Sequence, residues 1–199
     1  MVARDLERHL NDVSLGSAAF AIALWIDEGY GSADERAIFG VSIGTVAEVD
    51  GMRAAPALRE IPDDQWYSRP CSERWNSGNW AHIVEQFLTP ETEQALDPLR
   101  EAIRIDEDLL EHHRPSCDFG WPCSCESTAV RRWIEVGVAA LAGTKVPATL
   151  PTTPDLLVFA ESPDLSCAQR ITAMRRTIDA ARFHETFPAW QAACQDCRR

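Results

Sequence analysis

The amino-acid sequence predicts one α+β domain over residues 1–193, in which helices cover a small, mainly antiparallel sheet, followed by a polar tail over residues 194–199. Two apolar segments, residues 18–26 and 37–46, are joined by a connection too short for a crossover helix, so we expect them to pair as antiparallel strands. A third apolar segment, residues 155–161, predicts a strand much later in the chain. The other segments have the spacing of amphipathic helices, and 199 residues are enough to bury a substantial core.

The first strand is predicted from an unbroken apolar run near the N-terminus. Nine consecutive apolar residues stand between Gly16 and Gly29, whereas a transmembrane helix needs about 20. A short apolar run bounded by turn residues is typical of a strand buried on both faces. Before this run, apolar residues at helical spacing predict a helix over residues 3–13. In the second strand, Gly40 and Gly44 indicate a bulge or a close backbone approach.

The middle and the C-terminal part of the chain are predicted to be mainly helical. A short helix or loop is expected over residues 47–61, and Asn76 or Asn79 is placed to cap a helix through residues 82–88. A longer helix begins at Pro90 and carries a dense acidic face, which is typical of a solvated helix surface. Further helices are predicted over residues 127–143, 165–181 and 183–193.

The net charge of −12 limits the classes of partner. Nucleic-acid binding requires a basic surface that neutralises phosphates, so no nucleic-acid partner is expected. The charge has two interpretations: it keeps the protein in solution, or it steers a basic protein partner towards an acidic face. The charged N-terminal sequence is unlike a signal peptide, and no apolar segment is long enough to span a membrane. We therefore expect a cytoplasmic protein without a membrane partner.

A cluster of histidine and cysteine residues is the main candidate for a metal site. Five possible ligands lie within fourteen residues: His112, His113, Cys117, Cys123 and Cys125. Imidazole and thiolate groups bind zinc, and the predicted set of four ligands is His113, Cys117, Cys123 and Cys125. A closed set would make the zinc structural, whereas an open coordination position would make it catalytic. Alternatively, the cysteines are small buried apolar groups, or two of them form a disulfide.

Tryptophan and arginine residues in the centre of the sequence form a candidate binding surface. Trp66, Arg69 and Arg74 are its predicted members, because exposed tryptophan and arginine are common anchors of protein interfaces. Tryptophan also serves as a core residue whose N–H finds a carbonyl group. We expect that second role for Trp75 and Trp80, and both roles stay open for Trp66.

Three parts of the sequence together resemble one known family. They are the N-terminal FAIALWIDE, the central ERWNSGNW, and the C-terminal LLVFAESPDLSCAQRITAMRRTIDAARFHETFPAW. The combination is similar to the bacterial domain-of-unknown-function family 4303, which has an Arg-Trp-Ser-x-x-x-Trp signature. Family members usually have a strand after the middle helix. In this sequence, residues 117–126 and the helix after them stand in its place. The resemblance implies an intracellular α+β domain and supplies no catalytic residues. The matching residues are Arg74, Trp75, Trp80, Asp164, Arg175 and Phe187.

The sequence contains no motif that identifies an enzyme class. It has no Gly-x-Ser-x-Gly nucleophile elbow, no phosphate-binding loop and no dinucleotide fingerprint. The leading hypothesis is therefore a non-enzymatic domain that binds a basic protein partner, like an immunity protein or an antitoxin. The alternative is a zinc-binding protein whose metal is held by the loop over residues 112–125.

Overall fold

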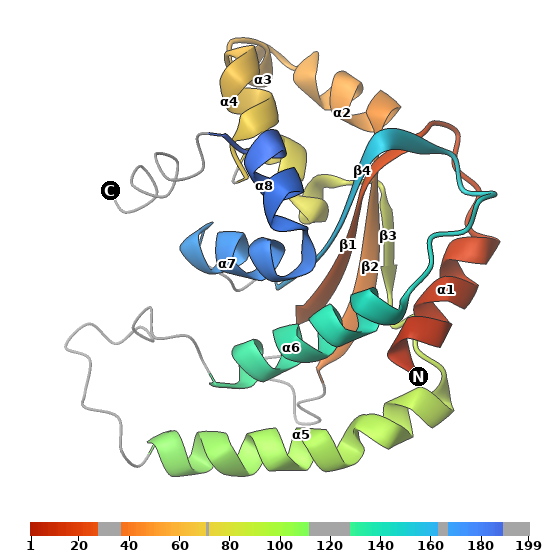
Figure 1. Ribbon diagram of the computed structural model, residues 1–199, viewed down its shortest axis with the longest axis vertical. Helices are drawn as coiled ribbons and strands as arrows, with labels where there is room; N and C mark the ends of the chain where they lie inside the picture. Colours follow the sequence, from red (N-terminus) through yellow and green to blue (C-terminus); the bar gives the residue numbers. More distant parts are fainter. Residues whose placement is uncertain (28–36, 71, 112–127, 163–166, 189–199) are drawn as a thin grey trace.

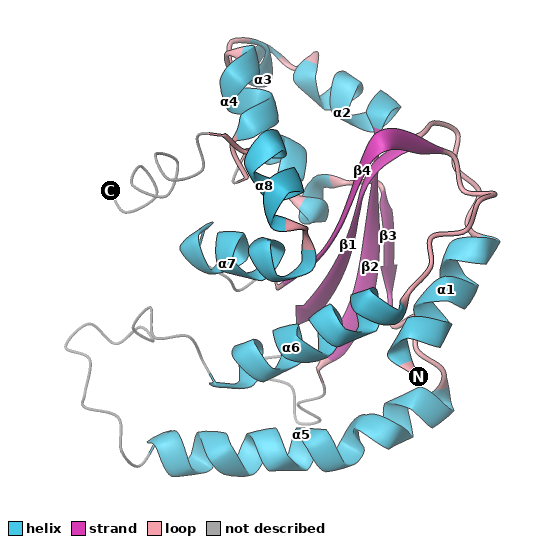
Figure 2. Cartoon of the chain, viewed as in Figure 1, coloured by secondary structure: helices cyan, strands magenta, loops and turns pink. Residues whose placement is uncertain are grey.

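The computed structural model describes five stretches of the chain, and these form an α+β fold around one sheet (Figures 1 and 2). The described residues are 1–27, 37–70, 72–111, 128–162 and 167–188. The four strands are β1 (Ala19–Asp27), β2 (Ile38–Thr45), β3 (His82–Glu85) and β4 (Thr152–Glu161). Their order in the sheet is β3-β2-β1-β4. β2 is antiparallel to both β1 and β3, whereas β1 and β4 are parallel. The predicted α+β class is confirmed, and two of the three strand pairings are antiparallel.

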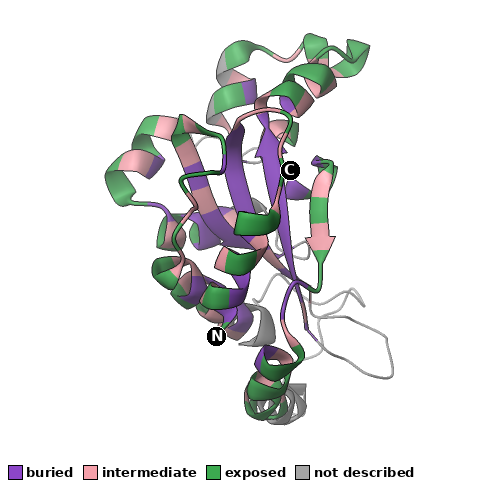
Figure 3. Cartoon of the chain, turned by 90° about the vertical axis from the view of Figure 1, so that its right-hand side faces the viewer, coloured by how far each residue is buried: buried purple, intermediate pink, exposed green. Residues whose placement is uncertain are grey.

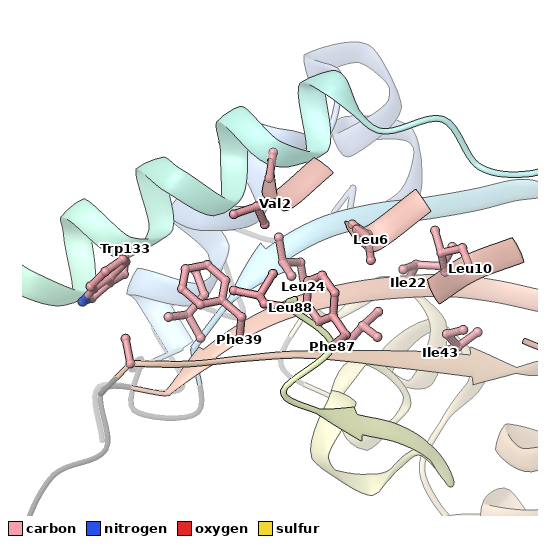
Figure 4. Close-up of a cluster of buried hydrophobic side chains, with 14 of the residues drawn as sticks. Val2, Leu6, Leu10, Ile22, Leu24, Phe39, Ile43, Phe87, Leu88 and Trp133 are labelled. Atoms are coloured by element: carbon pink, nitrogen blue, oxygen red, sulfur yellow. The ribbon is translucent and has the colours of Figure 1, made fainter. Parts of the chain in front are cut away.

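One face of the sheet is covered by α1 (Val2–Asp12) and α6 (Thr128–Gly143), and α5 (Pro90–Glu111) packs against α6. The apolar side of α1 places Leu6 and Leu10 against Ile22 and Leu24 of β1 (Figure 4). Leu6, Ile22 and Leu24 are fully buried. We call this cluster the α1 core.

The opposite face carries a second cluster of buried side chains, which includes Phe20, Trp66, Trp75 and Trp80. We call this cluster the tryptophan core. Its cover consists of α2 (Val46–Arg53), α3 (Pro56–Arg59), α4 (Asp63–Ser68), α7 (Cys167–Thr177), α8 (Ala180–Thr186) and two 3-10 turns, η1 (Glu73–Trp75) and η2 (Ser77–Asn79). β1 contributes Phe20 to this face, and further large rings fit beside it because neighbouring positions such as Gly44 are small. A Cβ on Gly44, for example, would lie 2.8 Å from atoms of both the Phe20 and Trp80 rings, so the close approach expected at this glycine is confirmed.

Because the sheet lies between the two cores, its central strands are buried on both sides (Figure 3). Along β1, Ile22, Leu24 and Ile26 face the α1 core, while Ala21 and Ala23 face the tryptophan core. The prediction of a first strand buried on both faces is therefore correct. Among the described residues, no helix combines the length and the apolar character that crossing a membrane requires.

The helix predicted through residues 82–88 is wrong, because this segment forms the edge strand β3. The strand pairs with β2 over Gly40–Ile43 and ends at Glu85, and the next residue, Gln86, has a positive φ of 57°. Asn76 does accept a hydrogen bond, from Gly78 N, but it caps the turn η2 and no α-helix. Glu48, the capping-box residue of α2, also accepts a hydrogen bond from Ala81 N at 2.7 Å. Because Ala81 directly precedes β3, this bond holds the start of β3 beside β2. The open edge of β2 thus outweighs the local helical pattern.

Candidate functional site

The ERWNSGNW segment closes the tryptophan core with two buried indole rings. Trp75 and Trp80 both meet the Phe20 ring edge to face, with centroids 5.4 and 5.6 Å from it. Trp75 Nε1 donates to the carbonyl of Tyr67 at 3.2 Å, and Trp80 Nε1 donates to that of Arg74 at 3.0 Å. Their exposed fractions are 4% and 1%. The core role predicted for these two residues is confirmed.

Trp66 is also a core residue, which corrects the expectation that it is an exposed anchor. Its exposed fraction is 0%, and it belongs to the tryptophan core. Because neighbouring residues on a helix point about 100° apart, α4 turns Tyr67 outward where it turns Trp66 inward. Tyr67 has an exposed fraction of 42%. The exposed aromatic residue of this surface is therefore one position later than predicted.

Two arginine guanidinium groups lie over the Tyr67 ring. Arg74 Cζ is 4.7 Å from the ring centroid and Arg53 Cζ is 5.5 Å from it. Arg74 also rests on the Phe20 ring at 4.2 Å, so its cation contacts both the surface and the core. Arg53 forms an ion pair with Asp63. We call Arg53, Tyr67 and Arg74 the Tyr67 cluster.

The Arg74 guanidinium group lies among three aromatic rings, those of Phe20, Tyr67 and Trp75. Burial lowers the pKa of Arg74, and the charges of Tyr67, Asp155 and Asp50 act in the opposite direction. Arg74 Nε is buried and has no hydrogen-bond partner among the described residues. Asp50, Asp63 and Asp155 are exposed; Asp63 is the ion-pair partner of Arg53, and the charges of Asp50 and Asp155 act on Arg74. The arrangement is an aromatic and cationic centre with an acidic rim.

The structure brings one further predicted binding residue to the same segment. Arg69 follows α4 directly and is half-buried, and its carbonyl accepts a hydrogen bond from Ser72 N at 3.0 Å. Of the three predicted binding residues, Arg74 lies in the cluster, Trp66 lies beneath it, and Arg69 lies at the end of the same helix. Tyr67 and Arg53 were not predicted from the sequence. Tyr67 could have been proposed because it follows Trp66 in a short helix, where two successive side chains point in different directions.

A second polar group lies buried where β4 ends. Ser77 Oγ donates to Glu161 Oε1, and Arg170 Nε of α7 lies 3.3 Å from Glu161 Oε2. Glu161 is only 2% exposed, and burial raises its pKa. The carboxyl group therefore ties η2 and α7 to the sheet. Nothing in the sequence pattern marked this glutamate, because an acidic residue at the end of a strand is ordinarily solvated.

The predicted zinc ligands His113, Cys117, Cys123 and Cys125 lie outside the described residues. Within the described part of the chain, no group of three or more histidine, cysteine, aspartate or glutamate side chains could hold a metal ion. The zinc site stays a prediction, and the zinc content of the purified protein, measured together with its free thiols, would test it.

No family model matches the chain, and neither the curated proteins nor the solved structures include a significant match to it. The resemblance to family 4303 therefore stays a prediction from the sequence.

Proposed function

We propose that this protein is a non-enzymatic, cytoplasmic domain that binds a basic protein partner through the Tyr67 cluster, in the manner of an immunity protein or an antitoxin. The observation that carries the proposal is the exposed Tyr67 ring, 42% accessible, held under two guanidinium groups. Tyrosine and arginine are among the residues that contribute most to binding at protein interfaces.

The cluster is ordered before a partner arrives. Arg74 is fixed between the Tyr67 and Phe20 rings, and Phe20 is itself packed against Trp75 and Trp80. An interface side chain that is already immobilised loses little conformational entropy on binding, a cost of about 0.5–1.5 kcal/mol for each mobile long side chain. A partner therefore meets a rigid aromatic surface.

The charges around the cluster favour a basic partner. Asp50, Asp63 and Asp155 are exposed near it, and the whole chain carries a net charge of −12. An apolar centre with a polar rim is the usual anatomy of a protein interface. Opposite charges on the partner would raise the association rate, and added salt would reduce that rate.

Site-specific photocrosslinking tests the proposal. A photoreactive phenylalanine derivative replaces either Tyr67 or Ile83 in the cells that naturally express the protein. Ile83 is a matched control, because it is 39% exposed but lies on the edge strand β3. We expect one basic protein to crosslink at position 67 and not at position 83.

Binding of the purified partner then tests the chemistry. Tyr67→Ala should weaken the affinity by at least about tenfold, equivalent to about 1.4 kcal/mol, whereas Ile83→Ala should leave it unchanged. Circular dichroism establishes that both variants are folded. Equal affinity of wild type and Tyr67→Ala, or a crosslinked partner that is acidic, would contradict the proposal.

A further inference from the structure

A pocket of about 150 Å³ opens beside the edge strand β4, among residues of α1, α6 and the end of α7. Val138 of α6, Val158 of β4 and Val146 form much of the accessible part of its apolar wall. Leu6 and Leu10 of the α1 core lie behind this wall, and their exposed fractions of 0% and 1% leave a ligand almost no surface of theirs to contact. A volume of about 150 Å³ is large enough for one small apolar molecule.

One cation stands at the edge of this apolar pocket. Arg176, in the last turn of α7, contributes to the lining, and it is half-exposed at 38%. Its Nη1 lies 3.8 Å from Glu135 Oε1, whose side chain is 55% exposed. An ion pair at that distance and exposure is weak. The guanidinium group has five N–H donors in a planar arrangement that suits a carboxylate, so it can bind an anion at the pocket.

The other polar groups of the lining are already engaged. Thr144 Oγ1 donates to the Ala140 carbonyl at 2.8 Å, and Thr177 Oγ1 donates to the Met174 carbonyl at 3.1 Å. Both hydroxyl protons are therefore used in hydrogen bonds to carbonyl groups near the C-terminal ends of α6 and α7. Among the side chains that line the pocket, Arg176 supplies the donors for a ligand.

We propose that this pocket binds a small monocarboxylate with an aliphatic or aromatic tail of about six carbons. The tail lies against Val138, Val146 and Val158, and the carboxylate pairs with Arg176. This assigns a ligand site that is separate from the proposed protein-binding surface. Neither proposal depends on the other.

Isothermal titration of the full chain with hexanoate, 1-hexanol and acetate tests the two parts of the pocket. Hexanoate should bind saturably, with a Kd of about 1 mM, and 1-hexanol should bind about tenfold more weakly because it lacks the charge. Acetate should show no saturable binding. From butyrate to hexanoate, each added methylene should strengthen binding about fourfold, as expected for about 0.8 kcal/mol per buried methylene.

Two pairs of variants locate the site. Ala142 is exposed and lines the pocket, so Ala142→Phe should abolish hexanoate binding, whereas Ala139→Phe, on the exposed side of the same helix, should not. Arg176→Gln should reduce hexanoate affinity about tenfold and leave hexanol binding intact. Arg175→Gln makes the same change of charge at the neighbouring exposed position and should have little effect.

Three results would overturn the proposal. The first is the absence of saturable hexanoate binding to the wild type, and the second is equal affinity for hexanoate and 1-hexanol. The third is unchanged hexanoate binding in both Ala142→Phe and Arg176→Gln.

Discussion

Trp66 and Tyr67 are neighbours in the sequence, but the Trp66 ring lies in the core and the Tyr67 ring lies at the surface. Sequence patterns indicated an aromatic and arginine surface here, but the phase of a six-residue helix cannot be derived from so few positions. The core positions of Trp75 and Trp80 were predictable, because indole rings are large and apolar. Glu161 was not predictable, since its burial depends on Ser77, which lies 84 residues away in the sequence.

Glu161 leads to a prediction at the scale of one residue. Its pKa is raised by burial, although the charge of Arg170 and the Ser77 hydroxyl both act to lower it. A folded-state pKa above the unfolded one means that the folded protein binds the proton more tightly. The contribution of Glu161 to stability is therefore fully present below the unfolded pKa, near 4.5, and is lost as the pH rises through the folded pKa.

The variant Glu161→Gln keeps the shape of the side chain and removes this titration. The free energy of unfolding of the wild type, minus that of Glu161→Gln, should fall between pH 4 and pH 8. Urea unfolding at a series of pH values measures it. A difference that does not vary with pH would show that the wild-type carboxyl group titrates alike in the folded and unfolded states.

At the scale of elements, α1 is fastened to the start of α5 by one buried carboxylate. Asp5 is 1% exposed, and its Oδ2 accepts hydrogen bonds from Thr89 N at 2.9 Å and Thr89 Oγ1 at 3.0 Å. Thr89 Oγ1 in turn accepts a hydrogen bond from Thr92 N in the first turn of α5. Burial by itself would raise the pKa of Asp5, but hydrogen bonds to Thr92 and Thr89, with the charge of Arg8, lower it overall.

Replacing Asp5 should therefore destabilise the fold in a pH-dependent way. Asp5→Ala leaves the donors of Thr89 unpaired and should cost about 2–3 kcal/mol at pH 7, and Asp5→Asn should cost less. Because the folded pKa is lowered, the stability from Asp5 is present above the unfolded pKa and is lost as the pH falls through the folded one. Asp12→Ala, at the exposed end of α1, is the control and should change the free energy of unfolding by less than about 0.5 kcal/mol. If the two alanine variants unfold at the same urea concentration, Asp5 does not fasten the helices.

The elements also differ in how far the sequence predicts them. The strands over residues 18–26 and 37–46 carry their own signal, because each is an apolar run bounded by turn residues, and both match β1 and β2 within one residue at each end. β3 carries no such signal. Its four residues become a strand through backbone pairing with β2, a contact between segments about 40 residues apart in the sequence.

At the scale of the whole molecule, one sheet supports two cores. In β1, the side chains of Ile22 and Leu24 lie in the α1 core, and those of Ala21 and Ala23 lie in the tryptophan core. The sequence indicates that both cores share this strand, because it is apolar throughout. It does not indicate that β4 joins β1 in parallel, since that placement depends on how the helices between them pack.

Because the two cores share their strands, we predict that they unfold together. Leu6→Ala removes a fully buried side chain of the α1 core and should cost about 2–5 kcal/mol. Fluorotryptophan resonances of Trp133, in the α1 core, and Trp80, in the tryptophan core, report the two faces separately during denaturant unfolding. Both resonances should give the same midpoint in the wild type, and Leu6→Ala should shift both midpoints equally, as expected for one cooperative unit. A shift at Trp133 with an unchanged midpoint at Trp80 would instead mean that the tryptophan core folds without the α1 core, and the chain would then consist of two units.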